Sequence, residues 1–223
     1  MTKKTHLKVG SPGEPQQARA IETRSRILSV AVQEFAEKGF AGARVDRIAD
    51  LADANKRMIY QYFGNKNGLY LATLEECYRN IRSLESMINI DGLGPADALA
   101  EVVRHTVDYQ ASHPGFIRLV MAENMNQGQF IRELDSLRVV NSPAIEMLNG
   151  ILARGVQEGV FEPGVDPVDL HMSISALSFF NVANKHTFSW IFQHDMDSDA
   201  FLVNRREYIV REILNSVMRG SSS

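Results

Sequence analysis

The chain has 223 residues, of which 44% are hydrophobic and 23% charged, a balance typical of globular proteins that bury a sizeable core. Its single cysteine, Cys77, excludes an intramolecular disulfide framework and fits a reducing compartment. The sequence has neither an N-terminal apolar run of the signal-peptide type nor a stretch of about 18 consecutive apolar residues. We therefore expect no membrane span and a cytoplasmic protein.

The net charge of −3 is unevenly distributed. Residues 1–66 contain 12 Lys and Arg against 7 Asp and Glu, a balance of +5, whereas residues 67–223 contain 12 against 20, a balance of −8. A basic excess confined to the N-terminal part indicates a polyanionic partner at that end of the molecule.

Residues 1–20 contain Gly, Pro, Lys and Gln without an apolar period, and we expect a flexible basic arm there. Its lysines Lys3, Lys4 and Lys8 either contact phosphates or a minor groove, or belong to a tail without a role in affinity. The sequence favours neither alternative.

The first predicted helix covers about residues 18–38. Its apolar face is formed by Ile27, Leu28, Ala31, Val32 and Phe35. Gly39 suits the left-handed conformation of a helix C-cap, and Phe40 is placed to pack back on Phe35. Core packing is the main role of this helix, with phosphate contacts from Arg24 or Arg26 as a secondary one.

Two short helices joined by a tight turn are predicted for residues 44–63. The first helix has an apolar face with helical spacing, made of Val45, Ile48, Ala49 and Ala52. Asn55 then suits the cap of a second helix over about residues 56–62, which Ile59 and Phe63 hold inward. The outward side chains are Lys56, Arg57, Met58, Tyr60 and Gln61. A helix-turn-helix presents such a surface to the major groove, whereas the alternative is a solvated helical hairpin.

A long helix is predicted from Lys66 to about Met87, with Asn65 as its cap. Its apolar face is formed by Leu74, Cys77, Tyr78, Ile81, Leu84 and Ile88. Lys66 at its N-terminus suits a phosphate contact. The helix is expected to connect an N-terminal module to the rest of the chain as a lever.

The remaining sequence shows helical patterns separated by Gly and Pro, and no convincing alternating β pattern. Helices are predicted over about residues 95–112, 116–124, 130–156, 166–187 and 198–218. In the second of these, Phe116, Leu119, Val120 and Met125 are the candidates for the inward face. Pro143 is expected to bend the third, and Asp166-Pro167 opens the fourth. The fold class is therefore all-α.

The stretch from Arg26 to Tyr78 resembles the N-terminal DNA-binding domain of TetR-family transcriptional regulators. The matching positions are Ile27, Ala31, Phe35, Gly39-Phe40, Val45, Ile48-Ala49, Ala52, the run Ile59–Phe63, Lys66, Leu69 and Leu74. The chain departs from the family at the turn, Asp53-Ala54-Asn55 in place of Gly-Val-Ser, at Ala43-Arg44 where a Thr is common, and at Asn67 where an acidic residue is usual. The resemblance implies an all-α protein with a three-helix DNA-binding domain, assigned to residues 21–66, and a C-terminal bundle for ligand binding and dimerisation, residues 67–220.

The resemblance also assigns partners. It implies a palindromic double-stranded DNA operator, which we expect to be contacted by the side chains of Arg44, Asn55, Lys56, Arg57, Met58, Tyr60, Tyr62 and Lys66. Tyr62 is alternatively a packing residue. It further implies a homodimer formed by the last two long helices, since a helix that is apolar on most sides is either central or shared; burial within one chain is the alternative.

A small-molecule inducer of unknown identity is the third implied partner. An apolar pocket with a few polar anchors is expected from His105, Tyr109, Phe116, Met121, Asn124, Met125, Met147, Phe179, Phe180 and Asn184. Each of these residues is alternatively a core residue.

Other chemistries find little support. His186 and His194 with Asp195, Asp197 and Asp199 resemble a metal cluster, but Ala200 and Arg206 stand where a calcium loop needs Gly and Glu, so we expect a solvated loop and no metal. No phosphate-binding Gly motif or nucleophile elbow is present, and neither an enzyme nor a cofactor is expected. The sequence predicts a ligand-responsive dimeric regulator that acts as a repressor and is released from DNA by its inducer. The alternative is a helical sensor or interaction protein whose N-terminal motif no longer binds DNA specifically.

Overall fold

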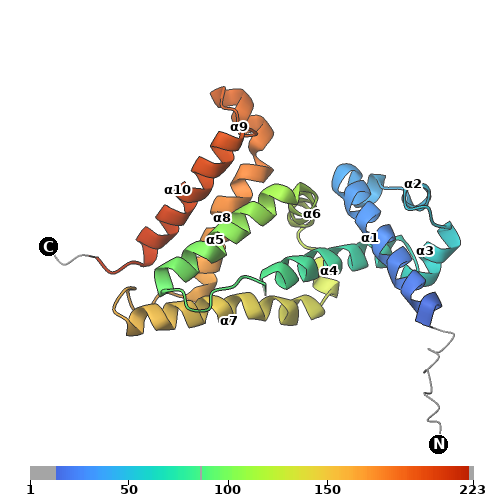
Figure 1. Ribbon diagram of the computed structural model, residues 1–223. Helices are drawn as coiled ribbons and strands as arrows, with labels where there is room; N and C mark the ends of the chain where they lie inside the picture. Colours follow the sequence, from blue (N-terminus) through green and yellow to red (C-terminus); the bar gives the residue numbers. More distant parts are fainter. Residues whose placement is uncertain (1–13, 86, 221–223) are drawn as a thin grey trace, which may run out of the picture. The chain divides into compact units, whose positions relative to one another are not determined.

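The computed structural model describes residues 14–85 and 87–220, and helices account for nearly all of the regular structure in these ranges (Figure 1). The exception there is an isolated antiparallel bridge between Phe161 and Met218. The all-α prediction is thus confirmed. The predicted arm lies mostly outside the described residues. None of the described helices is both long and apolar enough to cross a bilayer.

The chain divides into two compact units between Thr73 and Leu74, a few residues after the boundary expected at 66–67. The first unit contains α1 (Glu14–Gly42), α2 (Val45–Leu51), α3 (Lys56–Phe63) and the first turns of α4 (Lys66–Glu85). Gly39 interrupts α1 with a φ of 64°, as a residue without a Cβ can do at low cost. The Phe40 ring stacks on that of Phe35 with centroids 6.4 Å apart, which confirms the predicted packing.

The core of the first unit is formed by the predicted apolar faces. Its almost fully buried apolar side chains include Ile27, Leu28, Ala31, Phe35, Ile48, Ala52, Ile59 and Leu69. Tyr70 of α4 adds its ring edge-on to Phe35, with centroids 4.9 Å apart. Burial of this kind contributes roughly 1.5–3 kcal/mol for each large side chain, so α1 and α4 form the support on which the two short helices rest.

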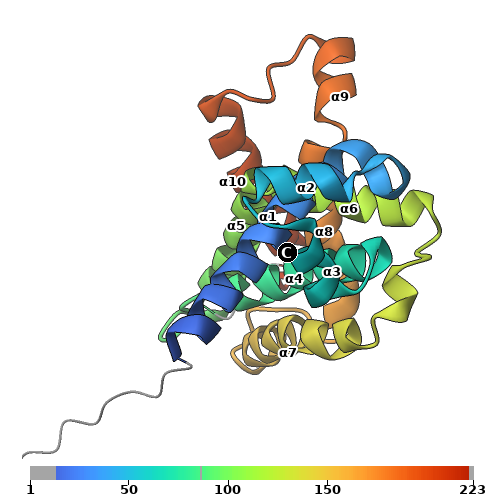
Figure 2. The same ribbon diagram turned by 90° about the vertical axis from the view of Figure 1, so that its right-hand side faces the viewer.

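The second unit contains the rest of α4, then α5 (Pro95–Ser112), α6 (Pro114–Met125), the 3-10 turn η1 (Ile131–Glu133), α7 (Ser136–Gln157), α8 (Pro167–Ala183), α9 (Lys185–Phe192) and α10 (Asp199–Val217). Helix α5 is central, because it packs against α6, α7, α8 and α10. The core around it includes Leu99, Val103, Leu148, Ile174 and Ile209. Viewed from the side, α9 extends away from this core at the far end of α8 and α10 (Figure 2).

Side chains cap the starts of α4, α8 and α10, and the caps at Asn65 and Asp166 match the prediction. The Asn65 side chain accepts from the Gly68 amide at 2.9 Å, and Asp166 accepts from the amides of Val168 and Asp169 at 2.7 and 3.0 Å. Ser198 accepts from the Phe201 amide at 3.3 Å. Each cap satisfies donors that the first turn of a helix leaves free.

Two predicted boundaries are wrong for a local reason. Helix α7 begins at Ser136 and not at residue 130, because the buried Glu123 carboxylate accepts from the amides of Phe130 and Ile131 at 3.2 and 3.0 Å and so stabilises a turn. The helix predicted over 166–187 is two helices, α8 and α9, that meet at Asn184, whose ψ is 5°. Asn is a weak helix former, and the amide of Asn184 still bonds to the Phe180 carbonyl at 3.1 Å.

Two smaller predictions also need correction. Helix α4 ends at Glu85, earlier than residue 87. Met125 does not face inward, because its side chain is 83% exposed. At about 100° of rotation per residue, a helix places Met125 on the side opposite to Phe116, nine residues earlier.

Candidate nucleic-acid interface and internal cavity

The turn between α2 and α3 is held from α1. The Nε of Arg26 donates to the Ala52 carbonyl at 2.6 Å, and its Nη2 donates to the Asp53 carbonyl at 3.4 Å. Asp53 has a φ of 44°, a left-handed conformation that Asp tolerates better than most residues. The sequence suggests a phosphate contact for Arg26, whereas its observed bonds cap the C-terminus of α2 and close the turn.

The start of α2 is held by Glu34 of α1, whose side chain is only 3% exposed. One carboxylate oxygen accepts from the backbone amide of Arg44 at 3.1 Å, and the other pairs with the Nε of Arg47 at 3.0 Å. A buried carboxylate with both oxygens occupied is a specific anchor, since leaving it unpaired is costly. The Arg44 side chain itself remains exposed.

Helix α3 presents its polar side chains outward. The Asn55 side chain caps it by accepting from the Arg57 amide at 2.8 Å, as predicted, and Ile59 is fully buried beneath it. Lys56, Arg57 and Gln61 are exposed, Tyr60 is 41% exposed, and Met58 and Tyr62 are half-buried.

The Lys56 ammonium forms an ion pair with an acidic neighbour. Its Nζ lies 2.6 Å from Asp46 of α2 and 5.9 Å from the centroid of the Tyr60 ring. The hydrogen bond between Lys56 and Asp46 raises the pKa of Lys56 and lowers the pKa of Asp46. Both groups are solvent-exposed, so the pair is weak and a stronger anion, such as a phosphate, is able to replace the carboxylate.

Lys66 and Tyr62, two further predicted DNA contacts, each contact other residues of the first unit. The Nζ of Lys66 donates to the Ala41 carbonyl at 3.2 Å and lies 5.1 Å from the Phe40 ring centroid. The Tyr62 ring meets Phe63 edge-on at 6.0 Å. Lys66 therefore fastens the C-terminal end of α1 and still has donors left for a phosphate, since an ammonium carries three.

The ten predicted pocket residues differ widely in burial. Tyr109 and Phe116 are buried, with ring centroids 6.2 Å apart. Asn124 and Met125 face solvent, and Phe180 is 42% exposed. The other five residues are half-buried: His105, Met121, Met147, Phe179 and Asn184.

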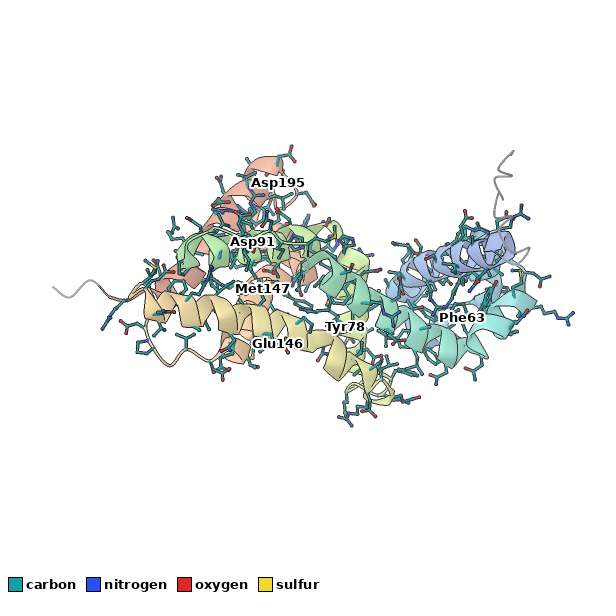
Figure 3. All side chains as sticks on the ribbon, turned by 60° about the horizontal axis from the view of Figure 1, so that its bottom comes forward. Phe63, Tyr78, Asp91, Glu146, Met147 and Asp195 are labelled. Atoms are coloured by element: carbon teal, nitrogen blue, oxygen red, sulfur yellow. The ribbon has the colours of Figure 1, made fainter. Side chains whose placement is uncertain are left out.

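A small cavity lies inside the second unit, bounded by α4, α5, α7 and α8. Of the predicted residues, Met147 is the one that lines it, and Figure 3 shows Met147 on α7 beside its exposed neighbour Glu146. The other apolar walls are Val102, Ala144, Leu148 and Ile174. The volume open to a water molecule is about 10 Å³, roughly the space that one water needs.

Polar groups that the sequence reasoning missed line the same cavity: Glu85, Thr106 and His171. The Glu85 carboxylate forms an ion pair with Arg82, and burial raises the pKa of Glu85. Burial lowers the pKa of His171, with the charge of Arg82 as a further cause. One signal for Glu85 is its place one turn after Ile81, on the stripe of α4 that the sequence identified as apolar.

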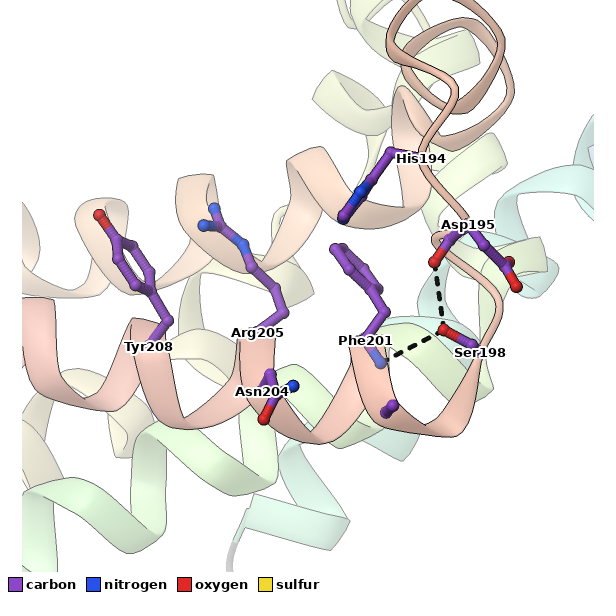
Figure 4. Close-up of a pocket in the computed structure, with 8 residues that line it drawn as sticks. His194, Asp195, Ser198, Phe201, Asn204, Arg205 and Tyr208 are labelled. Carbon is purple, nitrogen blue, oxygen red and sulfur yellow. Dashed lines mark hydrogen bonds between the residues drawn. The ribbon is translucent and has the colours of Figure 1, made fainter.

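A second, open hollow lies beside α10 (Figure 4), and the predicted acidic loop forms its edge. The rings of His194 and Phe201 meet edge-on at 5.1 Å there. Asp197 pairs with Lys185 at 2.7 Å, and the Asp195 side chain accepts from the Asp197 amide at 3.0 Å. These carboxylates are thus engaged in organising the loop between α9 and α10. Cys77 is buried, which raises the pKa of its thiol to about 12 and suits packing better than reactivity.

Comparisons with known proteins cover both units. Residues 27–73 match the model "Bacterial regulatory proteins, tetR family", and residues 95–213 match "Tetracyclin repressor-like, C-terminal domain". The chain is 35% identical over 171 residues to the HTH-type transcriptional repressor NicS of Pseudomonas putida. The aligned stretch covers 77% of this chain and 81% of that protein.

Two further likenesses agree with these matches. The chain is 41% identical over 106 residues to the HTH-type transcriptional repressor SCO4008 of Streptomyces coelicolor, covering 48% of this chain and 52% of that protein. Among solved structures, the transcriptional regulator SCO4942 from Streptomyces coelicolor superimposes with a TM-score of 0.66 and 27% identity, over 89% of this chain and 99% of that chain.

Proposed function

The chain belongs to the TetR family of bacterial transcriptional regulators, which are not enzymes, and from that premise we propose that it is a dimeric repressor that binds a palindromic operator and is released from it by a small molecule. The observation that carries the proposal is the outward face of α3. On it, two cations, a phenol and an amide stand exposed on a helix whose start and supporting turn are fixed by side-chain bonds.

These residue types suit base readout. Arg and Lys donate to guanine in the major groove, and Gln bonds to adenine with both its donor and its acceptor. Arg57 and Gln61 are four residues apart on α3, so they share one face. Lys56 and Tyr60 share the neighbouring face. Arg44 and Lys66, which lie outside α3, supply further cations for phosphates.

The dimer is supported by an apolar stripe on α8. Val168, Met172, Ala176 and Phe180 follow one another at intervals of four residues and are all exposed in the single chain. The opposite side of α8, with Leu170 and Ile174, is buried in the core. Helix α10 adds Leu202, Val203 and Tyr208, which are 40%, 51% and 41% exposed. Contiguous apolar surface of this kind marks an interaction site, and a two-fold partner would supply the matching copy.

Release would follow from unequal affinity of the small molecule for two states of the dimer, since a ligand shifts an equilibrium only by its differential binding. Helix α4 is continuous across the division between the units and contributes Glu85 to the internal cavity. We infer that α4 transmits the change.

The experiment that tests the DNA-binding part measures affinity for the DNA flanking the protein's own gene at two salt concentrations, beside random DNA of equal length. Arg57→Ala is expected to weaken specific binding by about 1–3 kcal/mol, because a base contact is lost. Lys56→Ala should also weaken it, because a cation on the DNA-facing surface is lost. Arg132→Ala, an exposed arginine of η1, is the matched control. Equal affinity of the wild-type protein for both DNAs would instead favour a sensor without DNA specificity.

A further inference from the structure

We propose that α9 is an exchange arm, which in the dimer lays Trp190 of one protomer into the open hollow beside α10 of the other. A second copy of this chain is thus the occupant of the hollow, and two-fold symmetry makes the exchange reciprocal. Since this is a second contact between two copies, beside the stripe on α8, it rests on the dimer of the proposed function.

Helix α9 carries large apolar side chains that the described part of the chain leaves exposed. None of its eight residues is buried, and Trp190, Ile191 and Phe192 are 79%, 66% and 62% exposed. A helix of this length is marginal in water unless it packs on something, and a soluble monomer rarely exposes large apolar side chains in such a group. The arm therefore has the composition of a surface that another molecule covers.

Aromatic contacts connect the arm to the proposed dimer interface. Phe180 ends the exposed stripe on α8, and its ring meets that of Phe188 edge-on with centroids 5.6 Å apart. The Phe188 ring lies in turn 4.5 Å from that of Phe192. The apolar surface is therefore continuous from α8 onto α9, so a copy of the chain seated on the stripe also lies within reach of the arm. This continuity favours a second copy, rather than an unrelated protein, as the partner of the arm.

The hollow beside α10 has the shape and lining of a site for an aromatic ring. Phe201, Arg205 and Tyr208 follow one another at intervals of four and three residues, so they line it from one face of α10 (Figure 4). The open space measures about 530 Å³. Because sites of roughly 300–1,000 Å³ hold small organic molecules, an indole ring has ample room.

Arg205 gives the hollow a preference for tryptophan. Its Nε donates to the Asn181 side chain of α8 at 3.0 Å, and its guanidinium lies 5.1 Å from the centroid of the Tyr208 ring. These contacts hold the guanidinium in place with one of its two faces on Tyr208. Guanidinium groups stack on aromatic rings, and indole is the ring that a cation binds best. The other face of Arg205 therefore suits the partner's Trp190.

Trp190 is the single tryptophan of the chain, so fluorescence of the full-length protein reports on the arm alone. At concentrations at which sedimentation shows a dimer, we expect a blue-shifted emission and several-fold weaker quenching by acrylamide than after dilution to monomers. The reason is that an indole 79% exposed in the single chain becomes buried. Met172→Asp, which places a charge on the stripe of α8, should show the exposed spectrum even at high concentration.

The outcomes of this measurement separate the arm from the proposed dimer. A wild-type dimer whose Trp190 stays as open to acrylamide as in the monomer would overturn the exchange and leave the dimer standing. Shielding that persists after dilution to monomers would mean that its own chain covers the indole, and would also overturn the exchange. A protein that is monomeric at every concentration would overturn the proposed dimer itself, and the arm with it.

Cross-linking locates the arm on the partner. Thr187 is exposed on α9 one turn before Trp190, and Asn204 is exposed on the wall of the hollow. Thr187→Cys protein is mixed with size-tagged Asn204→Cys protein and treated with a short bismaleimide, and covalent dimers of the two are expected. Asn215→Cys is the matched control, because Asn215 is exposed on the same face of α10 but about 16 Å further along it. Cys77 is buried and should not react. Equal cross-linking to both positions, or none to Asn204, would contradict the proposed site.

Trp190→Ala measures what the contact contributes to dimerisation. A tryptophan buried at an interface is commonly among its dominant residues, so the dissociation constant of the dimer should rise at least about tenfold. Met125→Ala truncates an exposed methionine of α6 and should leave that constant unchanged. Because both side chains are exposed in the single chain, both variants should fold as monomers do. An unchanged dissociation constant in Trp190→Ala would overturn the exchange.

Discussion

Single residues outside α3 determine how its outward face is presented. Glu34 holds the start of α2 through the Arg44 amide, and Arg26 holds its end through the Ala52 carbonyl. Neither role follows from the sequence, because helix periodicity places a side chain on a face but does not identify the backbone group that it reaches. The cap of Asn55 on α3 was predictable, since it acts within its own turn.

The ion pair between Lys56 and Asp46 yields a second prediction: removing Asp46 should change DNA affinity in the direction opposite to removing Lys56. Asp46→Asn removes a negative charge from the DNA-facing surface and frees the Lys56 ammonium, which Asp46 now holds at 2.6 Å. DNA affinity should therefore rise, and the plot of log K against log salt should become steeper by roughly 0.9, the value for one added phosphate contact. Fluorescence anisotropy between low and high salt measures both quantities.

A matched control is Asp97→Asn, which changes an exposed aspartate in the first turn of α5. Its affinity and slope should equal those of the wild-type protein. An Asp46→Asn slope that also equals the wild-type slope would mean that Lys56 does not approach the DNA backbone.

At the scale of helices, the sequence predicts what local chemistry determines. The caps at Asn65 and Asp166 and the buried face of α1 appear where spacing and side-chain type place them. The late start of α7 was not predictable, because it depends on the buried Glu123 carboxylate reaching across a turn. The cavity was missed for a similar reason: His171 joins Glu85 through the packing of α8 against other helices, whereas the sequence search favoured aromatic and Met residues.

Two glycines of α7 allow the effects of core packing and of helix propensity on stability to be measured separately. A Cβ at Gly155 would overlap the ring of Phe161, which is 1% exposed in the core. A Cβ at Gly150 meets nothing within 4 Å among the described residues. Gly155→Ala is therefore expected to cost about 1–3 kcal/mol through overpacking, whereas Gly150→Ala should gain about 0.5–1 kcal/mol from higher helix propensity.

Thermal unfolding of the two variants measures the difference. For a chain of this size, each kcal/mol shifts Tm by roughly 2–4 °C, so the shifts should have opposite signs and be resolved easily. If both variants were stabilised alike, the loop that carries Phe161 would have to move without cost, and the contact between that ring and α7 would not be part of the core.

At the scale of the whole molecule, function requires two features on different units: an exposed cationic helix on the first and an exposed apolar stripe on the second. A single copy of α3 reads only half of a palindrome, and operator affinity grows when a two-fold dimer binds both half-sites together. Specific binding should therefore be lost when the stripe on α8 is damaged, although no residue of α3 has changed.

Met172→Asp tests this dependence. Met172 is 62% exposed in the single chain, so a charge there should leave the folded monomer intact, yet in a dimer built on this stripe it would be buried without a partner. We expect sedimentation to show monomers at concentrations where the wild-type protein is dimeric, and operator affinity to fall towards that for random DNA. The wild-type Tm should also rise with protein concentration, as mass action requires of a dimer, whereas the Tm of the variant should not. Met125→Asp places the same charge on an exposed methionine of α6 and should change none of these quantities. A dimeric Met172→Asp with full operator affinity would place the interface on another surface of the chain.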